Sequence, residues 1–167
     1  SLSIGFENKA QGNQSQALGY QTVALGAYST AIGKNAQANY DNSMAVGDGA
    51  IADAADSYAF GKSTTTTGTG SYAFGYSASA SGSNSFALGR SASSSNESAF
   101  ALGRLATASG SFSTAIGYNV LANNSSATAL GYQTQATGQY STAMGNSTEA
   151  NYSSSTAIGH ESKANAN

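Results

Sequence analysis

The sequence of 167 residues contains no cysteine, no proline and no tryptophan, and it has a single histidine. Without cysteine there is no disulfide framework, which fits a protein exported unfolded. Charged residues make up only 8% of the chain and the net charge is −2, so a nucleic-acid partner is not expected. Residues 1–167 contain no run of eighteen apolar residues, so we expect neither a signal peptide nor a membrane anchor among them.

What the sequence does contain is a repeat of fourteen residues. An apolar residue followed by glycine recurs twelve times at this spacing without an insertion. A fixed period decides the fold class before any local pattern, and fourteen residues are too few for a helical hairpin or a propeller blade. The period fits one coil of a parallel β-solenoid, whose coils stack on each other. The marker glycines are Gly5, Gly19, Gly33, Gly47, Gly61, Gly75, Gly89, Gly103, Gly117, Gly131, Gly145 and Gly159.

Each repeat has two halves that predict two short strands. The first half reads Ser-x-Ala-apolar-Gly, as at 29–33, and the second reads small-x-Ala-polar-Gly, as at 134–138. Alternation over five residues predicts a strand, because successive side chains point to opposite faces. The marker glycine stands where a chain that leaves a strand needs positive φ. The equivalent position of the second half also holds Tyr40 and Ala54, so we expect a less uniform second turn.

One face of both strands carries only small residues, and this face must point into the coil. In one coil these residues are Ser71, Ala73, Gly75, Ala78, Ala80 and Gly82. We expect the buried hydroxyls to bond to hydroxyls or backbone of the coils above and below. The other face of the second strand is polar, as in Thr65, Thr67, Ser79 and Ser81.

The other face of the first strand is a stripe of large apolar residues along the whole rod. At about 4.8 Å per coil the rod is roughly 55 Å long, so the stripe exceeds the apolar patch that a monomer exposes. Homo-oligomerisation through the stripe is therefore expected, and the pattern leaves open a two-fold dimer or a cyclic assembly. Besides Ile4 and Leu18, the predicted interface residues are Ile32, Val46, Phe60, Phe74, Leu88, Leu102, Ile116, Leu130, Met144 and Ile158.

The run Ser-x-Ala-Ile/Leu-Gly-Tyr-x-Ala/Thr-x-Ala-x-Gly resembles the head repeat of YadA-like trimeric autotransporter adhesins, over essentially all residues. The resemblance implies an all-β fold, a left-handed parallel β-roll, assembled as a parallel homotrimer whose apolar first strands face the axis. This sequence departs from the family pattern at Ser3, Ala99 and Ala127. Its outward residues form an aromatic ladder and then a threonine ladder: Tyr58, Tyr72, Phe86 and Phe100, followed by Thr114, Thr128, Thr142 and Thr156.

The same resemblance implies a non-enzymatic adhesin head on the surface of a bacterium, anchored in its outer membrane. Its implied partners are host matrix proteins such as collagen, fibronectin or laminin, host cell-surface receptors, and like molecules on other cells. We interpret residues 1–167 as one head domain cut from a longer chain, since in this family a neck, a stalk and a membrane anchor follow the head. Two alternatives are a rigid trimeric spacer that binds nothing and a segment of a phage or viral fibre. The sequence does not name the ligand.

Few residues suggest chemistry, and for each the simpler interpretation is preferred. His160 lies at a turn and has no predictable nucleophile as its partner, so a surface role is expected. Four carboxylates concentrate within two coils, but their spacing matches no calcium loop, so neither a metal nor a cofactor is predicted. They are Asp41, Asp48, Asp53 and Asp56.

Charges also line up after successive marker glycines. Lys34, Asp48 and Lys62 predict a surface charge ladder of small energetic weight. Arg90 and Arg104 continue the row as a like-charge pair, for which an anionic ligand is the alternative to a solvated surface.

The second strand has its own exceptions. Val23 and Leu25 are apolar, which suits either a partner contact or packing of a segment that precedes the chain. The hydroxyl grid of this face is interrupted by charged residues and holds only one Thr-x-Thr coil, which argues against ice binding.

Overall fold

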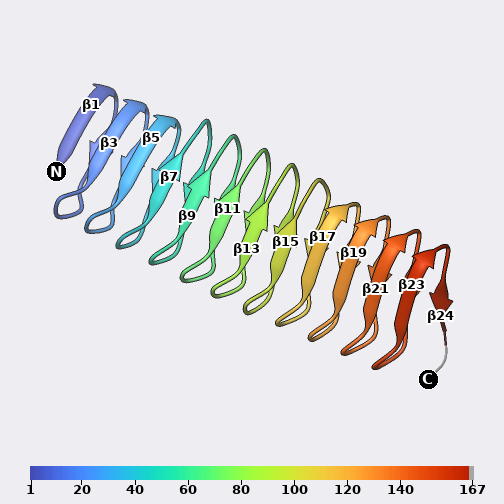
Figure 1. The fold of residues 1–167 in the computed structure, drawn as a ribbon. Coiled ribbons are helices and arrows are strands. Elements are labelled where there is room, and N and C mark those ends of the chain that lie inside the picture. Colours follow the sequence, from blue (N-terminus) through green and yellow to red (C-terminus); the bar gives the residue numbers. More distant parts are fainter. Residues whose placement is uncertain (166–167) are drawn as a thin grey trace.

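In the computed structural model, which describes residues 1–165, the chain winds into twelve coils of a parallel β-solenoid (Figure 1). Each coil contributes one strand to each of two twelve-stranded sheets. Every strand pairs in parallel with the strand one coil later, so Ala73 lies beside Ala87 and Phe74 beside Leu88. The fourteen-residue register is therefore unbroken, and the predicted solenoid is confirmed.

The first sheet holds the strands that end near the marker glycines. They are five residues long towards both ends of the rod and three residues long in its middle. Their bounds are β1 (Leu2–Phe6), β3 (Gln16–Tyr20), β5 (Thr30–Lys34), β7 (Met44–Val46), β9 (Tyr58–Phe60), β11 (Tyr72–Phe74), β13 (Phe86–Leu88), β15 (Phe100–Leu102), β17 (Thr114–Tyr118), β19 (Thr128–Tyr132), β21 (Thr142–Asn146) and β23 (Thr156–His160).

The second sheet has strands of only two residues, shorter than the five that the alternation predicts. Hydrogen bonds between coils continue beyond them, as from the Leu25 amide to the Ala38 carbonyl at 2.9 Å. The bounds are β2 (Lys9–Ala10), β4 (Val23–Ala24), β6 (Gln37–Ala38), β8 (Ile51–Ala52), β10 (Thr65–Thr66), β12 (Ser79–Ala80), β14 (Ser93–Ser94), β16 (Thr107–Ala108), β18 (Leu121–Ala122), β20 (Gln135–Ala136), β22 (Glu149–Ala150) and β24 (Lys163–Ala164).

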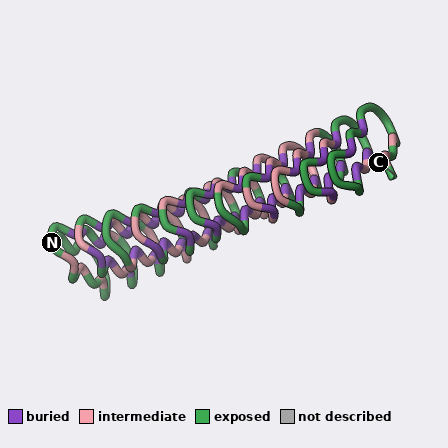
Figure 2. Tube along the Cα trace, turned by 90° about the horizontal axis from the view of Figure 1, so that it is seen from below, coloured by how far each residue is buried: buried purple, intermediate pink, exposed green. Residues whose placement is uncertain are grey.

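Small side chains fill the space between the two sheets, as predicted, and Figure 2 shows buried segments alternating with exposed ones around each coil. Ser71, Ala73 and Ala80 are fully buried. The interior is not limited to serine, alanine and glycine, however, since Val120 and Thr134 are also fully buried. Such a thin core buries little apolar area, so the backbone ladders between coils must carry much of the stability of the single chain.

The buried serine hydroxyls find partners mostly within their own coil, and not in the coils above and below as the sequence analysis expected. Ser29 donates to the Gly26 carbonyl at 2.7 Å, and Ser113 donates to the Gly110 carbonyl at 2.6 Å. Ser94 reaches across the roll to the Ser85 hydroxyl at 3.1 Å. The turn that precedes each first-sheet strand bends back far enough to bring its carbonyl within reach, which explains the difference.

The first turn needs its glycine for two reasons. Gly75 has φ of 133°, and a Cβ atom added there would lie 2.4 Å from the carbonyl oxygen of Gly89 in the next coil. An L-residue is therefore strained at this position and also lacks space.

In the second turn, positive φ lies two residues after the position that the sequence analysis assigned. Tyr28 and Asn42 have φ of 59° and 55°, whereas Tyr40 is not left-handed. A Cβ atom added at Gly26 would lie 2.0 Å from the carbonyl oxygen of Tyr40, whereas Tyr40 carries a side chain at the equivalent position of its own coil. The left-handed residue therefore recurs from coil to coil, while the residue two positions before it varies.

Candidate binding surfaces

The apolar stripe runs along the outer face of the first sheet and has no cover in the single chain. Of the ten predicted interface residues, four are exposed and six are half-buried. The exposed ones are Ile32, Leu88, Met144 and Ile158, and the half-buried ones are Val46, Phe60, Phe74, Leu102, Ile116 and Leu130. The structure thus brings all ten to one face, and their neighbours along the rod shield them only in part.

Aromatic rings stack along the middle of this stripe. The ring centroids of Tyr58 and Tyr72 are 5.0 Å apart, and those of Phe60 and Phe74 are 4.9 Å apart. The ladder continues from Phe86 to Phe100 at 5.3 Å. Stacking sets the rings one coil apart, so the aromatic ladder expected from the sequence is a continuous surface.

The turns form the two long edges of the rod (Figure 1). We call the row of residues directly after the marker glycines the first-turn edge. On it, Lys62 lies 3.8 Å from Asp48, as the charge ladder predicts. Arg90 stacks over the ring of Tyr76 at 5.6 Å. Arg104 stacks over the ring of Tyr118 at 5.4 Å.

The two arginine side chains stack in opposite directions along the rod, because Tyr76 lies one coil before Arg90 and Tyr118 lies one coil after Arg104. Within residues 1–165 neither guanidinium forms an ion pair with a carboxylate. Stacking on an aromatic face orders an arginine side chain while its N–H groups remain available. The pair is therefore preorganised for an anionic group.

The second-turn edge consists of the residues between each second-sheet strand and the next first-sheet strand. Tyr28, Phe112 and Tyr140 project from it and are 56–59% exposed. Its carboxylates bond along the rod: the Asp41 carboxylate accepts from the Ala27 amide at 2.8 Å, and the Asp56 carboxylate accepts from Asn42. In the described part of the chain no three histidine, cysteine or acidic side chains gather closely enough to hold a metal ion.

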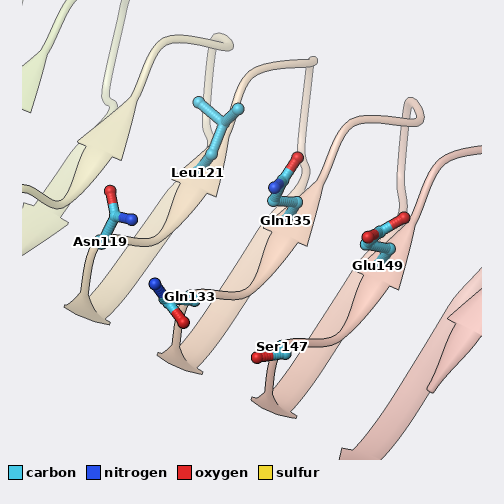
Figure 3. Close-up of a pocket in the computed structure, with 6 residues that line it drawn as sticks. All are labelled: Asn119, Leu121, Gln133, Gln135, Ser147 and Glu149. Atoms are coloured by element: carbon cyan, nitrogen blue, oxygen red, sulfur yellow. The ribbon is translucent and has the colours of Figure 1, made fainter. Parts of the chain in front are cut away.

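A groove of about 370 Å³ opens between the first turns and the outer face of the second sheet. Figure 3 shows that one row of its lining comes from the turns and the other from the second-sheet strands. The lining residues are Asn119, Leu121, Gln133, Gln135, Ser147 and Glu149. The sequence analysis missed this groove, although long amide side chains at positions that hold serine in the middle coils signal it.

The remaining candidates lie apart from one another. His160 is exposed at the first-turn edge with Glu161 as its neighbour at 4.0 Å, and no nucleophile bonds to it within the described residues. Val23 is half-buried and Leu25 is exposed. At the groove, a hydrogen bond of 2.9 Å from Lys163 lowers the pKa of the Glu149 carboxyl.

The family model of the YadA head domain repeat, which spans two copies of the repeat, matches residues 10–36, 24–50, 41–64, 67–92, 94–119, 122–148 and 153–167. The chain belongs to the YadA-like head family. Heads of this family are adhesin-like structural domains of trimeric autotransporters and are not enzymes. No curated protein sequence matches the chain. Among residues 1–165 no helix is long and apolar enough to cross a lipid bilayer.

Proposed function

We propose that three copies of this YadA-like head assemble in parallel around one axis, as left-handed rolls whose apolar stripes meet at the centre. The uncovered stripe supports this, because each large side chain transferred from water contributes about 1.5–3 kcal/mol. The family supports the number three. Covering the stripe leaves the second sheet on the outside, since the two sheets form opposite walls of the roll.

The trimer acts as an adhesin head that attaches a bacterial surface to host matrix proteins, such as collagen, fibronectin or laminin, or to host receptors. Contacts between heads on neighbouring cells add autoagglutination. The observation that carries this proposal is the polar groove beside Gln133 and Gln135, which opens away from the stripe. Three symmetry-related copies of a shallow site raise avidity for an extended, repetitive partner.

The test is a binding measurement on the assembled head. Its solution mass is determined first by light scattering, and immobilised collagen, fibronectin and laminin are then titrated. We expect a threefold mass and binding to at least one matrix protein. Gln133→Ala with Gln135→Ala should weaken that binding. Ser79→Ala with Ser93→Ala, on the second sheet four and three coils before Gln135, should leave it unchanged.

A rigid spacer is the second candidate, and the unbroken register of both sheets favours it. A rod without bulges or insertions transmits position from one end to the other without any binding site of its own. A stable trimer that binds none of the matrix proteins and does not agglutinate particles coated with it would support the spacer over the adhesin.

A further inference from the structure

Charges of opposite sign occupy the two edges of the rod. Between residues 30 and 132 every cation lies on the first-turn edge: Lys34, Lys62, Arg90 and Arg104. In the same stretch the second-turn edge carries only acids: Asp41, Asp53, Asp56 and Glu97. One acid, Asp48, lies on the first-turn edge, where it is paired with Lys62.

The geometry of a cyclic trimer brings these two edges together. When three parallel rolls turn their first sheets towards a common axis, each strand ends where the strand of the next copy begins. The interface is heterologous, so the first-turn edge of one copy meets the second-turn edge of its neighbour. This contact continues the interface that the apolar stripe forms.

The repeat also fixes which residues lie at the same height. Half a coil is seven residues, and the rise per coil is about 4.8 Å. A residue on the first-turn edge therefore lies within about 2.4 Å, along the axis, of the neighbour's residues seven positions before and after it. Glu97 is seven residues after Arg90 and seven before Arg104, so it faces both arginines. Asp41 has the same relation to Lys34.

The aromatic residues follow a similar correspondence. Three exposed aromatic residues of the second-turn edge have left-handed φ. For each of them, an aromatic residue of the first-turn edge lies within one coil of the same position along the rod axis. The pairs are Tyr28 with Tyr20, Phe112 with Tyr118, and Tyr140 with Tyr132. Phe112 and Tyr140 have φ of 57°, a conformation that bulky residues rarely adopt. A partner surface that buries these rings compensates for it.

From this juxtaposition we infer that the two edges of the rod form a subunit seam, in which Glu97 of one copy bridges Arg90 and Arg104 of the next. The inference rests on the proposed trimer. The aromatic residues of the two edges pack above and below this ion cluster. Stacking of Arg90 and Arg104 on Tyr76 and Tyr118 holds the two guanidiniums on either side of the carboxylate.

Cysteine pairs test the seam directly, because the chain has no cysteine of its own. In Glu97→Cys/Arg104→Cys the two positions of one chain lie on opposite edges, more than about 10 Å apart. A disulfide requires Cα atoms within about 7 Å, so any bond must join two copies. We expect oxidation to yield a covalent trimer on a non-reducing gel, with no larger species, because a ring of three closes.

The matched control is Lys62→Cys/Glu97→Cys, whose positions lie on the same two edges but two and a half coils apart, about 12 Å along the rod. It should remain monomeric on the gel. If the mass in solution is threefold and the matched pair links no better than the control, the seam is wrong and the proposed trimer stands. If the mass is that of a monomer, the proposed assembly itself is wrong. A ladder beyond the trimer would overturn the closed ring.

Charge reversal gives a second measurement that does not depend on oxidation. Glu97→Arg places three cations at the seam and should lower the temperature at which the trimer dissociates. Adding Arg90→Glu and Arg104→Glu should restore that temperature, because the seam regains opposite charges. A triple variant that is no more stable than Glu97→Arg would contradict the pairing.

Discussion

The middle of the rod and its C-terminal third share the same repeat but differ in the outward side chains of their first-sheet strands. In the aromatic segment, β9–β15, the outward residues two positions before the apolar one are Tyr58, Tyr72, Phe86 and Phe100. In the threonine segment, β17–β23, they are Thr114, Thr128, Thr142 and Thr156. The aromatic segment therefore offers a wider apolar surface to a partner. In the threonine segment each strand presents one large apolar side chain and one hydroxyl. In the proposed trimer, we therefore expect the middle of the rod to contribute most of the assembly energy.

The two segments also differ beneath the first turn. Ala78, Ala92 and Ala106 fill this buried position in the aromatic segment, with Thr64 as the exception, and the strands are three residues long. In the threonine segment Val120, Thr134 and Thr148 fill it, and the strands extend to five residues. The size of this side chain does not by itself set the strand length, because β5 also has five residues above the buried Ala36. The two segments thus differ in their buried side chains as well as in their outward ones.

The largest expected effect comes from a charge in the stripe. Leu88→Asp in the aromatic segment and Ile116→Asp in the threonine segment should both convert the trimer to monomer, because an unpaired buried charge costs several kcal/mol. Ser93→Asp, on the outer face of the second sheet, should leave the mass unchanged. Light scattering measures all three, and a Leu88→Asp variant that remains a stable trimer would show that the stripe is not the interface.

Shortening the outward side chains of each segment tests whether the two segments differ in interface energy. Tyr72→Thr with Phe86→Thr removes two stacked aromatic side chains, each of which contributes about 1.5–3 kcal/mol when buried. We expect the dissociation temperature of the trimer to fall clearly. Thr128→Ser with Thr142→Ser, which removes one methyl group at each position, should lower it much less. Equal effects of the two pairs would mean that the aromatic segment has no special role.

The coil, the register and the inward small residues follow from the sequence, because a period without insertions leaves one way to stack Ala73 on Ala87. The position of the residue with positive φ in the second turn does not follow from the sequence. Gly26 lies close to the next coil and is not the left-handed residue, and a glycine in a sequence does not distinguish these two situations. The residue that adopts the left-handed conformation, Tyr28, is of a type that the sequence would not suggest.

For the candidate binding surfaces, too, the sequence predicts some features and not others. Placement of the stripe on one face follows from alternation, since every second residue shares a face. The groove lined by Gln133 and Gln135 depends on how two rows of side chains from different walls of a coil come together. Likewise, Arg90 and Arg104 are adjacent in the repeat, but only the packed side chains show that each stacks on a tyrosine away from the other.

A smaller effect concerns the buried position beneath the first turn. Among residues 1–165 the fully buried hydroxyl of Thr134 has no hydrogen-bond partner, whereas Val120 fills the same position one coil earlier. Thr134→Val keeps the shape and removes the desolvated hydroxyl, so we expect the free energy of unfolding to rise by about 1 kcal/mol. Urea denaturation followed by circular dichroism measures it.

Thr148→Val is the matched control, one coil further on. The Thr148 hydroxyl has carbonyl oxygens of Met144 and Gly159 at 3.3 and 3.2 Å, so its removal loses a hydrogen bond and should give no gain. If both variants are equally destabilised, the Thr134 hydroxyl has a partner and the difference between the two coils disappears.

The smallest expected effect lies at the C-terminal end of the rod, on the outer face of the second sheet. The hydrogen bond from Lys163 lowers the pKa of Glu149, so the pair stabilises the folded state above the pH at which a free glutamate ionises, about 4.3. This contribution is lost as the pH falls further and the folded-state carboxylate takes up its proton. Both side chains are partly exposed, so salt screens the pair and the change in stability is slight. Titration of the Glu149 carboxyl carbon by NMR should show a pKa that rises in Lys163→Gln and does not move in Lys9→Gln, at the opposite end of the same sheet. An unchanged pKa in Lys163→Gln would mean that the pair does not persist in solution, and the last coils would then rest on their backbone ladders and small core alone.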